Sequence, residues 1–267
     1  MTANMFLVAL TLAHGATLES ANLNVSVGDK FTYETSITSQ TDAPFGAFST
    51  KTTEVMTLEV VSSSDGWFRF KATTDQHEIE SDAPGPMAGR SQMGMIQSYD
   101  VSPKRKMRAW KLEDRGSYPE EDAEGMRSQA KTIESAGFQS LVLPDGDLAV
   151  GTRWSHESKP LVPSFGGAQS DVDGKLKIEY KVLEFTGSGG DRAVVIEAEV
   201  SGDYFVSISA DQGEFEMDMA VEGLTKFWVR LADGVVTKME TEMETDISAD
   251  FGEVTTTTKI SLKLKSN

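Results

Sequence analysis

The sequence predicts a mainly β fold: an antiparallel curved sheet or half-barrel built from two similar meanders, with one prominent helix near residues 119–136. Three features of the 267 residues support this prediction. Apolar and polar side chains alternate over most of the chain, turn sequences separate the alternating runs, and one segment has helical spacing. Strands with one apolar and one polar face are typical of antiparallel sheets with one solvated side.

The alternating runs can be followed along the whole chain. In the first half they cover residues 23–37, 56–60 and 68–72, with turns at Gly28-Asp29 and Ser62–Gly66. In the second half they cover residues 176–182, 194–200, 215–221, 227–231, 235–247 and 259–265. Because successive side chains of a strand point to opposite faces, each run predicts a strand with a dry side and a wet side.

The segment 119–136 predicts the helix. Pro119 suits a first helical position, acidic residues follow in the first turn, and Gly137 is a suitable stop. The apolar residues are spaced by three or four and form one narrow stripe, made of Ala123, Met126, Ala130 and Ile133. We therefore expect this helix to lie across the open face of the curved sheet.

Two similar segments lie 123 residues apart. Val27–Glu34 and Val150–Glu157 both carry a valine and a glycine before a basic residue and an aromatic one. Each is followed by a strand, a turn and a second strand, so we predict that one meander is duplicated, over residues 17–140 and 141–267. The alternative is that such a glycine is simply common wherever a strand restarts after a turn.

The segment Leu143–Trp154 contains Pro144 and then Val-Gly-Thr-Arg-Trp. It resembles the P-x(n)-V-G-[DST]-x-W signature of an uncharacterised exported bacterial β-rich family, which is similar to the half-barrels of lipoprotein-carrier proteins. The resemblance implies an envelope location and an apolar ligand on the concave face, and it supplies no catalytic residues. Many members of that family are lipoproteins, whereas this sequence has no cysteine for a lipid anchor.

The first residues predict export. Residues 5–13 are apolar and small residues follow, so we expect a signal peptide over residues 1–16 and a periplasmic or extracellular mature chain without a transmembrane segment. No Lys or Arg precedes Lys30, whereas most signal peptides begin with a positive charge. The alternatives are a misassigned start and a buried first strand.

Composition argues against several classes of function. Acids outnumber bases 42 to 25, for a net charge of −17, which disfavours nucleic-acid binding. The absence of cysteine excludes disulfides, thiolate zinc sites and cysteine nucleophiles. Histidine is scarce and no Gly-x-Ser-x-Gly motif occurs, so we expect no enzyme, no cofactor and no metal. A hydrolase using two carboxylates is the remaining enzymatic hypothesis.

The C-terminal third combines acidic and methionine-rich alternation. Residues 214–222 and 240–246 each predict a strand with one acidic face and one Met-rich face. Because like charges directly opposite each other destabilise a sheet, we expect these two strands not to be immediate partners without intervening bases. A hairpin near residues 249–253 would place Lys259 and Lys263 beside the acids of 240–246.

These patterns lead to two functional hypotheses. The first is an exported, non-enzymatic envelope protein that binds an apolar ligand or lipid on the concave face, gated by the loop 84–96 with its Met87, Met93 and Met95. Its candidate ligand-binding residues are Met217, Met219, Met239, Met243, Trp110, Trp154 and Trp228. The alternative is a structural or interaction protein whose acidic strand face docks a cationic partner or Ca²⁺. The basic residues of 104–111 are expected at a solvated hairpin end, with anionic lipid headgroups as the other possible contact.

Overall fold

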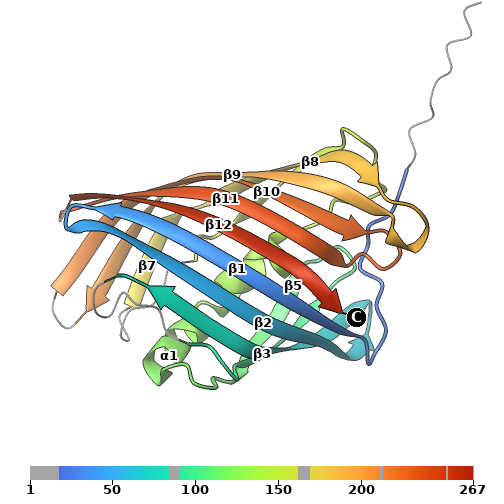
Figure 1. Cartoon of the computed structure of the whole chain (residues 1–267), viewed down its shortest axis with the longest axis horizontal. Coiled ribbons are helices and arrows are strands. Elements are labelled where there is room, and N and C mark those ends of the chain that lie inside the picture. The colour runs from blue at the N-terminus through green and yellow to red at the C-terminus, as the bar shows by residue number, and fades with distance from the viewer. Residues whose placement is uncertain (1–17, 84–90, 162–168, 211–212, 251, 267) are drawn as a thin grey trace, which may run out of the picture.

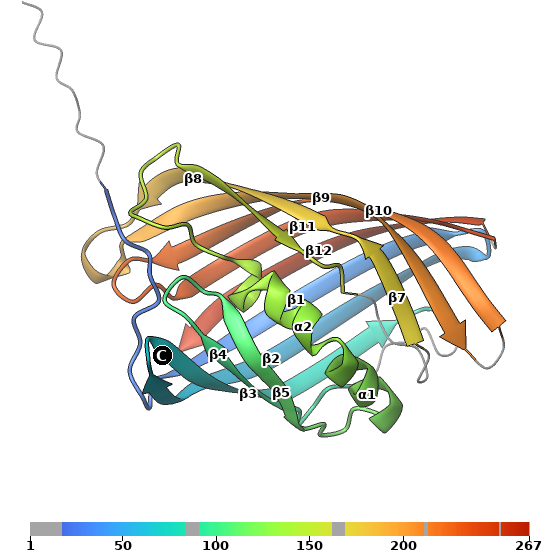
Figure 2. The ribbon, with the colours of Figure 1, turned by 180° about the vertical axis from the view of Figure 1, so that it is seen from behind.

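A computed structural model of the chain describes residues 18–83, 91–161, 169–210, 213–250 and 252–266. Within these ranges twelve strands form one antiparallel sheet that curves around two short helices (Figures 1 and 2). Strand pairing runs from β5 at one edge to β6 at the other without closing into a barrel. The predicted curved antiparallel sheet is therefore confirmed. The expected signal peptide, residues 1–16, lies outside the described residues.

Along the described chain, five strands precede the helices and seven follow them. The strands are β1 (Lys30–Ala43), β2 (Gly46–Ser64), β3 (Trp67–Ser81), β4 (Ile96–Val101), β5 (Met107–Asp114), β6 (Arg153–Ser158), β7 (Gln169–Gly174), β8 (Leu176–Thr186), β9 (Ala193–Ala210), β10 (Gly213–Arg230), β11 (Val236–Ala249) and β12 (Gly252–Ser266). The helices are α1 (Glu120–Ser128) and α2 (Ala130–Ala136), with 3-10 turns η2 (Phe138–Ser140) and η3 (Gly189–Asp191).

The sheet consists of two meanders joined along one seam. Strands β1 to β5 are neighbours in chain order, as are β8 to β12, and β6 pairs with β8. The seam is the pairing of β1 with β12, in which Ile37 lies opposite Ile260. β7 lies off this path and pairs with the second half of β9. β1 and β12, the first and last strands in the sequence, are thus hydrogen-bonded to each other and lie in the middle of the sheet.

The two similar sequence segments form turns with the same hydrogen bonds. Gly28 and Gly151 both have positive φ, 96° and 87°, which favours glycine. The Gly28 N–H donates to Val60 O at 2.8 Å, and the Gly151 N–H donates to Val182 O at 2.9 Å. The same two valines donate back to the residue after each glycine. That both halves derive from one duplicated meander stays a prediction.

The predicted helix is present as two pieces. α1 and α2 are separated at Gln129, whose φ of −92° and ψ of 11° interrupt the helical geometry. The predicted apolar stripe is retained, because Ala123 is fully buried and the other three residues pack against the core. α2 lies across the opening of the half-barrel (Figure 2) and contacts both β5 and β6. Its Glu134 accepts from the Trp110 N–H of β5, and its Ser135 O accepts from His156 Nε2 of β6.

An N-terminal strap, residues 18–25, closes the end of the half-barrel that holds the main core. Ala21, Leu23 and Val25 are buried there. The Leu23 N–H donates to Pro103 O at 2.9 Å, and the Asn24 N–H donates to Asp233 O at 2.8 Å. The strap therefore ties together the β4–β5 turn and the β10–β11 turn, which are far apart in the sequence.

One member of the basic cluster corrects the sequence prediction. Arg105 was expected at a solvated hairpin end, but its side chain is fully buried. Its Nη1 donates to Gly234 O at 2.8 Å and its Nη2 to Gln139 Oε1 at 2.6 Å, and its guanidinium lies 4.8 Å from the centre of the Phe138 ring. Burial lowers the pKa of Arg105 to about 10, opposed by the surrounding tyrosines.

The two acidic strands, β10 and β11, pair directly, with a base between their carboxylates, which the prediction allowed. Their register places Lys226 opposite Glu240 and only Glu222 opposite another acid, Glu244, so repulsion is limited to one direct pair. The prediction for the last strand is confirmed for the hairpin of β11 and β12 and for Lys259, which lies 2.9 Å from Glu242, whereas Lys263 lies opposite Lys238.

This single acidic pair gives a first testable expectation. Replacing Glu222 with Lys turns repulsion with Glu244 into attraction and should raise the free energy of unfolding by about 0.5 kcal/mol. Urea denaturation at low and high salt measures it, and the gain should shrink as salt screens the pair. Glu222→Gln, which only removes repulsion, should give a smaller gain, and a loss of stability in Glu222→Lys would contradict the expectation.

Candidate functional site

The two faces of the sheet differ sharply in chemistry. The inner face, which packs against α1 and α2, continues beyond the main core towards the β1–β2, β9–β10 and β11–β12 hairpins. Register aligns its side chains in rows that cross the strands, one of which contains Thr50, Ser39, Thr258, Met243, Gly223, Val200 and Ile178. The outer face carries the charged residues that alternate with them.

One part of the inner face, formed by β12, β1 and β2, is lined by hydroxyl groups. Ser39 and Thr258 share a hydrogen bond of 3.0 Å across the seam, as do Thr41 and Thr256. Each hydroxyl can donate one hydrogen bond and accept two, so these pairs retain acceptor capacity. These hydroxyl pairs make this part of the face polar without adding charge.

The other part of the inner face, formed by β7 and β9 to β11, is apolar. Met217, Met219 and Met243 pack around a small cluster of Tyr204, Val206 and Val221 that is separate from the main core. All three methionines are partly exposed. Met239 packs against the main core instead. The four predicted methionines thus share the inner face, as the alternation indicated.

The three predicted tryptophans do not join the methionines in one site. Trp110 is buried in the main core, where its Nε1 donates to Gln97. Trp154 stacks on Tyr180 with ring centres 5.0 Å apart and donates to Val142 O. Trp228 is a correction: its neighbours Phe227 and Val229 point into the core, so Trp228 faces outward, with Lys238 Nζ 4.2 Å from its ring centre.

The described methionines of the predicted gate differ in their exposure to solvent. Met93 is exposed and Met95 is buried. Met87 lies outside the described residues, as does most of the proposed gating loop. The gate therefore stays a prediction.

Sequence reasoning missed one residue of the inner face, Glu54 on β2. It lies opposite His77 of β3 on one side and Thr35 of β1 on the other. Thr74 Oγ1 donates to Glu54 Oε1 at 3.2 Å, and burial raises the pKa of the Glu54 carboxyl. The sequence alone indicates that Glu54 faces inward, because it continues the inward positions of Met56 and Leu58 in steps of two.

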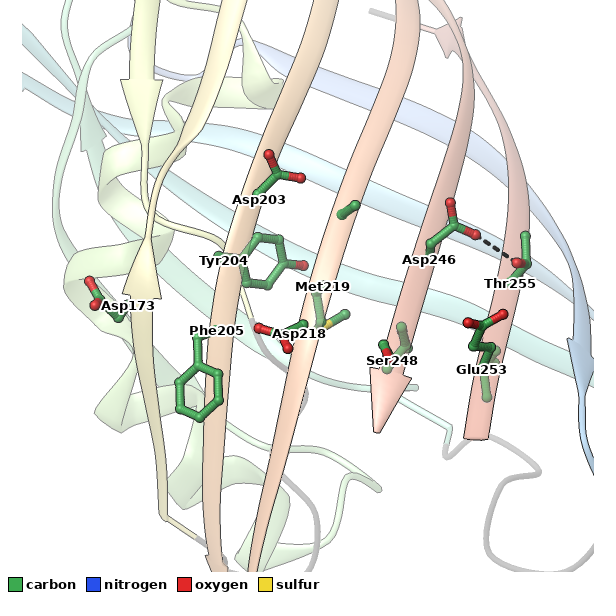
Figure 3. A pocket seen from close by; sticks show the side chains of 13 residues that line it. Asp173, Asp203, Tyr204, Phe205, Asp218, Met219, Asp246, Ser248, Glu253 and Thr255 are labelled. Carbon is green, nitrogen blue, oxygen red and sulfur yellow. Dashed lines mark hydrogen bonds between the residues drawn. The ribbon is translucent and has the colours of Figure 1, made fainter. Parts of the chain in front are cut away.

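The outer face has an acidic hollow of about 690 Å³ near the strand tips (Figure 3). Asp203, Asp218 and Asp246 line it from β9, β10 and β11, together with Asp173 and Glu253. No Lys or Arg lines the hollow among the described residues. In the described part of the chain no group of three or more His, Asp or Glu is placed to hold a metal ion. No described helix combines the length and apolarity that crossing a bilayer requires.

These features define an open antiparallel half-barrel with an acidic outer face and an inner face on which Glu54 is the carboxylate among apolar and hydroxyl side chains. No protein-family model matches the sequence, and no curated protein matches it. Among solved structures it is similar to a protein from Bacteroides fragilis described as exported with a YmcC-like fold, with 8% identity over 92% of this chain and 99% of that chain and a TM-score of 0.28. A Vibrio parahaemolyticus domain described as an outer membrane lipoprotein-sorting protein has 10% identity over 88% and 86% of the two chains and a TM-score of 0.15.

Proposed function

We propose that this chain is an exported, non-enzymatic envelope protein that holds an apolar ligand or lipid chain against the inner face of its sheet. The observation that carries the proposal is the chemistry of that face beyond the main core. Partly exposed methionines lie beside the small cluster of Tyr204, Val206 and Val221. Hydroxyl groups of β12 and β1 lie next to the methionines on the same face. The support for export is the apolar run at residues 5–13.

The physical basis of binding would be burial of apolar surface. Each methylene of a ligand that leaves water contributes about 0.8 kcal/mol. Methionine side chains are flexible and polarisable, so Met217, Met219 and Met243 can repack around chains of different shape. The hydroxyl part can meet a polar group of the ligand without the cost of burying an unpaired charge.

The proposal is tested by native mass spectrometry of the protein purified from its host. We expect a bound mass that is lost on organic extraction. Met243→Glu should remove the bound mass, because it places a charge in the centre of the inner face, whereas Met243→Leu should retain it. Circular dichroism shows whether each variant is folded. An unliganded protein from the host that also takes up no added dodecanol contradicts the proposal.

The acidic hollow favours a second candidate function, docking of a cationic partner on the outer face. Five carboxylates line one hollow beside the partly exposed ring of Phe205, a combination suited to a lysine- or arginine-rich segment. Binding of a lysine-rich peptide should weaken with added salt and in the double variant Asp218→Asn/Asp246→Asn. Binding that is indifferent to both changes counts against this function, and a melting temperature raised by millimolar Ca²⁺ would favour the ion instead.

A further inference from the structure

Glu54 stands alone on the inner face. Register of the described residues gives the inward positions of β1 to β3 and β8 to β12, and Glu54 is their one carboxylate. Its neighbours in the row are His77, Thr35, Leu262 and Met239. A charged group in this position departs from the pattern that the rest of the face follows.

The charge of Glu54 has no described counterion. Thr74 donates a hydrogen bond to one of its oxygens, and no Lys or Arg among the described residues forms an ion pair with it. His77, directly opposite, does not compensate it, because burial lowers the pKa of His77 and favours its neutral form. A partly buried charge without a partner is costly, and a ligand cation would offset that cost.

The surroundings of Glu54 suit a ligand that has a polar head group and an alkyl tail. The next row along the strands holds Thr52, Ile37, Ile260 and Thr241, and Met243 lies one row further on β11. From β2 to β11 there are three strand spacings, or roughly 14 Å at about 4.8 Å each. An extended alkyl chain of about a dozen carbons covers that distance, from the carboxylate to Met239 on β11 in the same row.

We propose that Glu54 binds the ammonium head of a cationic amphiphile whose alkyl chain lies across the inner face. This inference rests on the proposed function and adds the chemical class of the ligand. Thr74 orients the carboxylate, and the free oxygen of Glu54 accepts the ammonium proton in a charge-assisted hydrogen bond of about 2.8 Å. Thr35 carries a hydroxyl in the same row, and Thr52 carries one in the adjoining row.

The test compares three probes of equal chain length: dodecylammonium and laurate below their critical micelle concentrations, and dodecanol below its solubility limit. Isothermal titration calorimetry measures the affinity of each for the full chain. We expect dodecylammonium to bind at least about tenfold more tightly than dodecanol, and laurate to bind most weakly. Glu54→Gln, which keeps the shape of the side chain, should abolish the preference for ammonium and leave dodecanol binding unchanged.

Glu78→Gln is the matched control, because Glu78 follows His77 on β3 but is exposed on the outer face. It should change the affinity of no probe. Equal binding of ammonium and dodecanol by the unaltered chain, or unchanged ammonium binding in Glu54→Gln, overturns the inference but leaves the proposed function standing. Failure of all three probes to bind overturns both. If Glu54→Gln does not fold, the order of affinities in the unaltered chain decides.

Discussion

Arg105→Ala is expected to lower the free energy of unfolding by about 4 kcal/mol, because it combines a cavity with lost buried hydrogen bonds. The Arg105 side chain is fully buried and donates to Gly234 O and Gln139 Oε1, so its removal leaves both acceptors without that donor. It also removes the cation from the face of Phe138. At about 2–4 °C per kcal/mol for a chain of this size, the melting temperature should fall by about 10 °C.

Thermal and urea denaturation, followed by circular dichroism, measure this loss. Lys106→Ala is the control, since Lys106 is the next residue in the same turn and is exposed. It should change the free energy of unfolding by less than about 0.5 kcal/mol. A loss in Arg105→Ala no larger than that of the control would show that the buried guanidinium contributes nothing to stability. Arg105→Lys should recover only part of the loss, because an ammonium group cannot span both acceptors as the planar guanidinium does.

Gly234→Ala is expected to lower the free energy of unfolding by about 3–5 kcal/mol, since it adds steric overlap to backbone strain. Gly234 has a φ of 69°, a conformation that side chains disfavour, and a β-carbon there would overlap the backbone of Asn22 and Leu23 in the N-terminal strap. The same glycine carries the carbonyl that accepts from Arg105. The variant should therefore loosen the strap from the β10–β11 turn.

Gly146→Ala separates strain from overlap. Gly146 has a similar φ of 88°, but a β-carbon there meets nothing within 4 Å. We expect this variant to lower the free energy of unfolding by only about 1–2 kcal/mol. Hydrogen exchange should show faster exchange at the Leu23 and Asn24 amides in Gly234→Ala but not in Gly146→Ala. Equal losses of stability in the two variants would contradict this expectation, because they would mean that the strap moves away from the added β-carbon without any loss of free energy of unfolding.

The candidate site shows how far the alternation of residues extends. Because side-chain direction in a strand has a period of two, the pattern placed Met217, Met219, Met239 and Met243 on one face without any knowledge of the partner strands. The same rule, applied to Phe227 and Val229, would have put Trp228 on the other face. Glu54 could have been found in this way too, but its lack of a counterion could not, because that depends on which strands lie beside β2.

Local spacing also predicted the turn glycines, the apolar stripe of the helical segment and the β11–β12 hairpin, since all these depend on residues close together in the chain. The burial of Arg105 depends on Gly234, 129 positions along the chain, and the closing of one end by the strap depends on contacts such as that of Asn24 with Asp233, 209 positions apart. Arg105 lies among other basic residues, and nothing in its neighbourhood along the chain distinguishes it from them. Its position inside the protein is set by the convergence of Gly234, Gln139 and Phe138, and such convergence is a property of the folded chain.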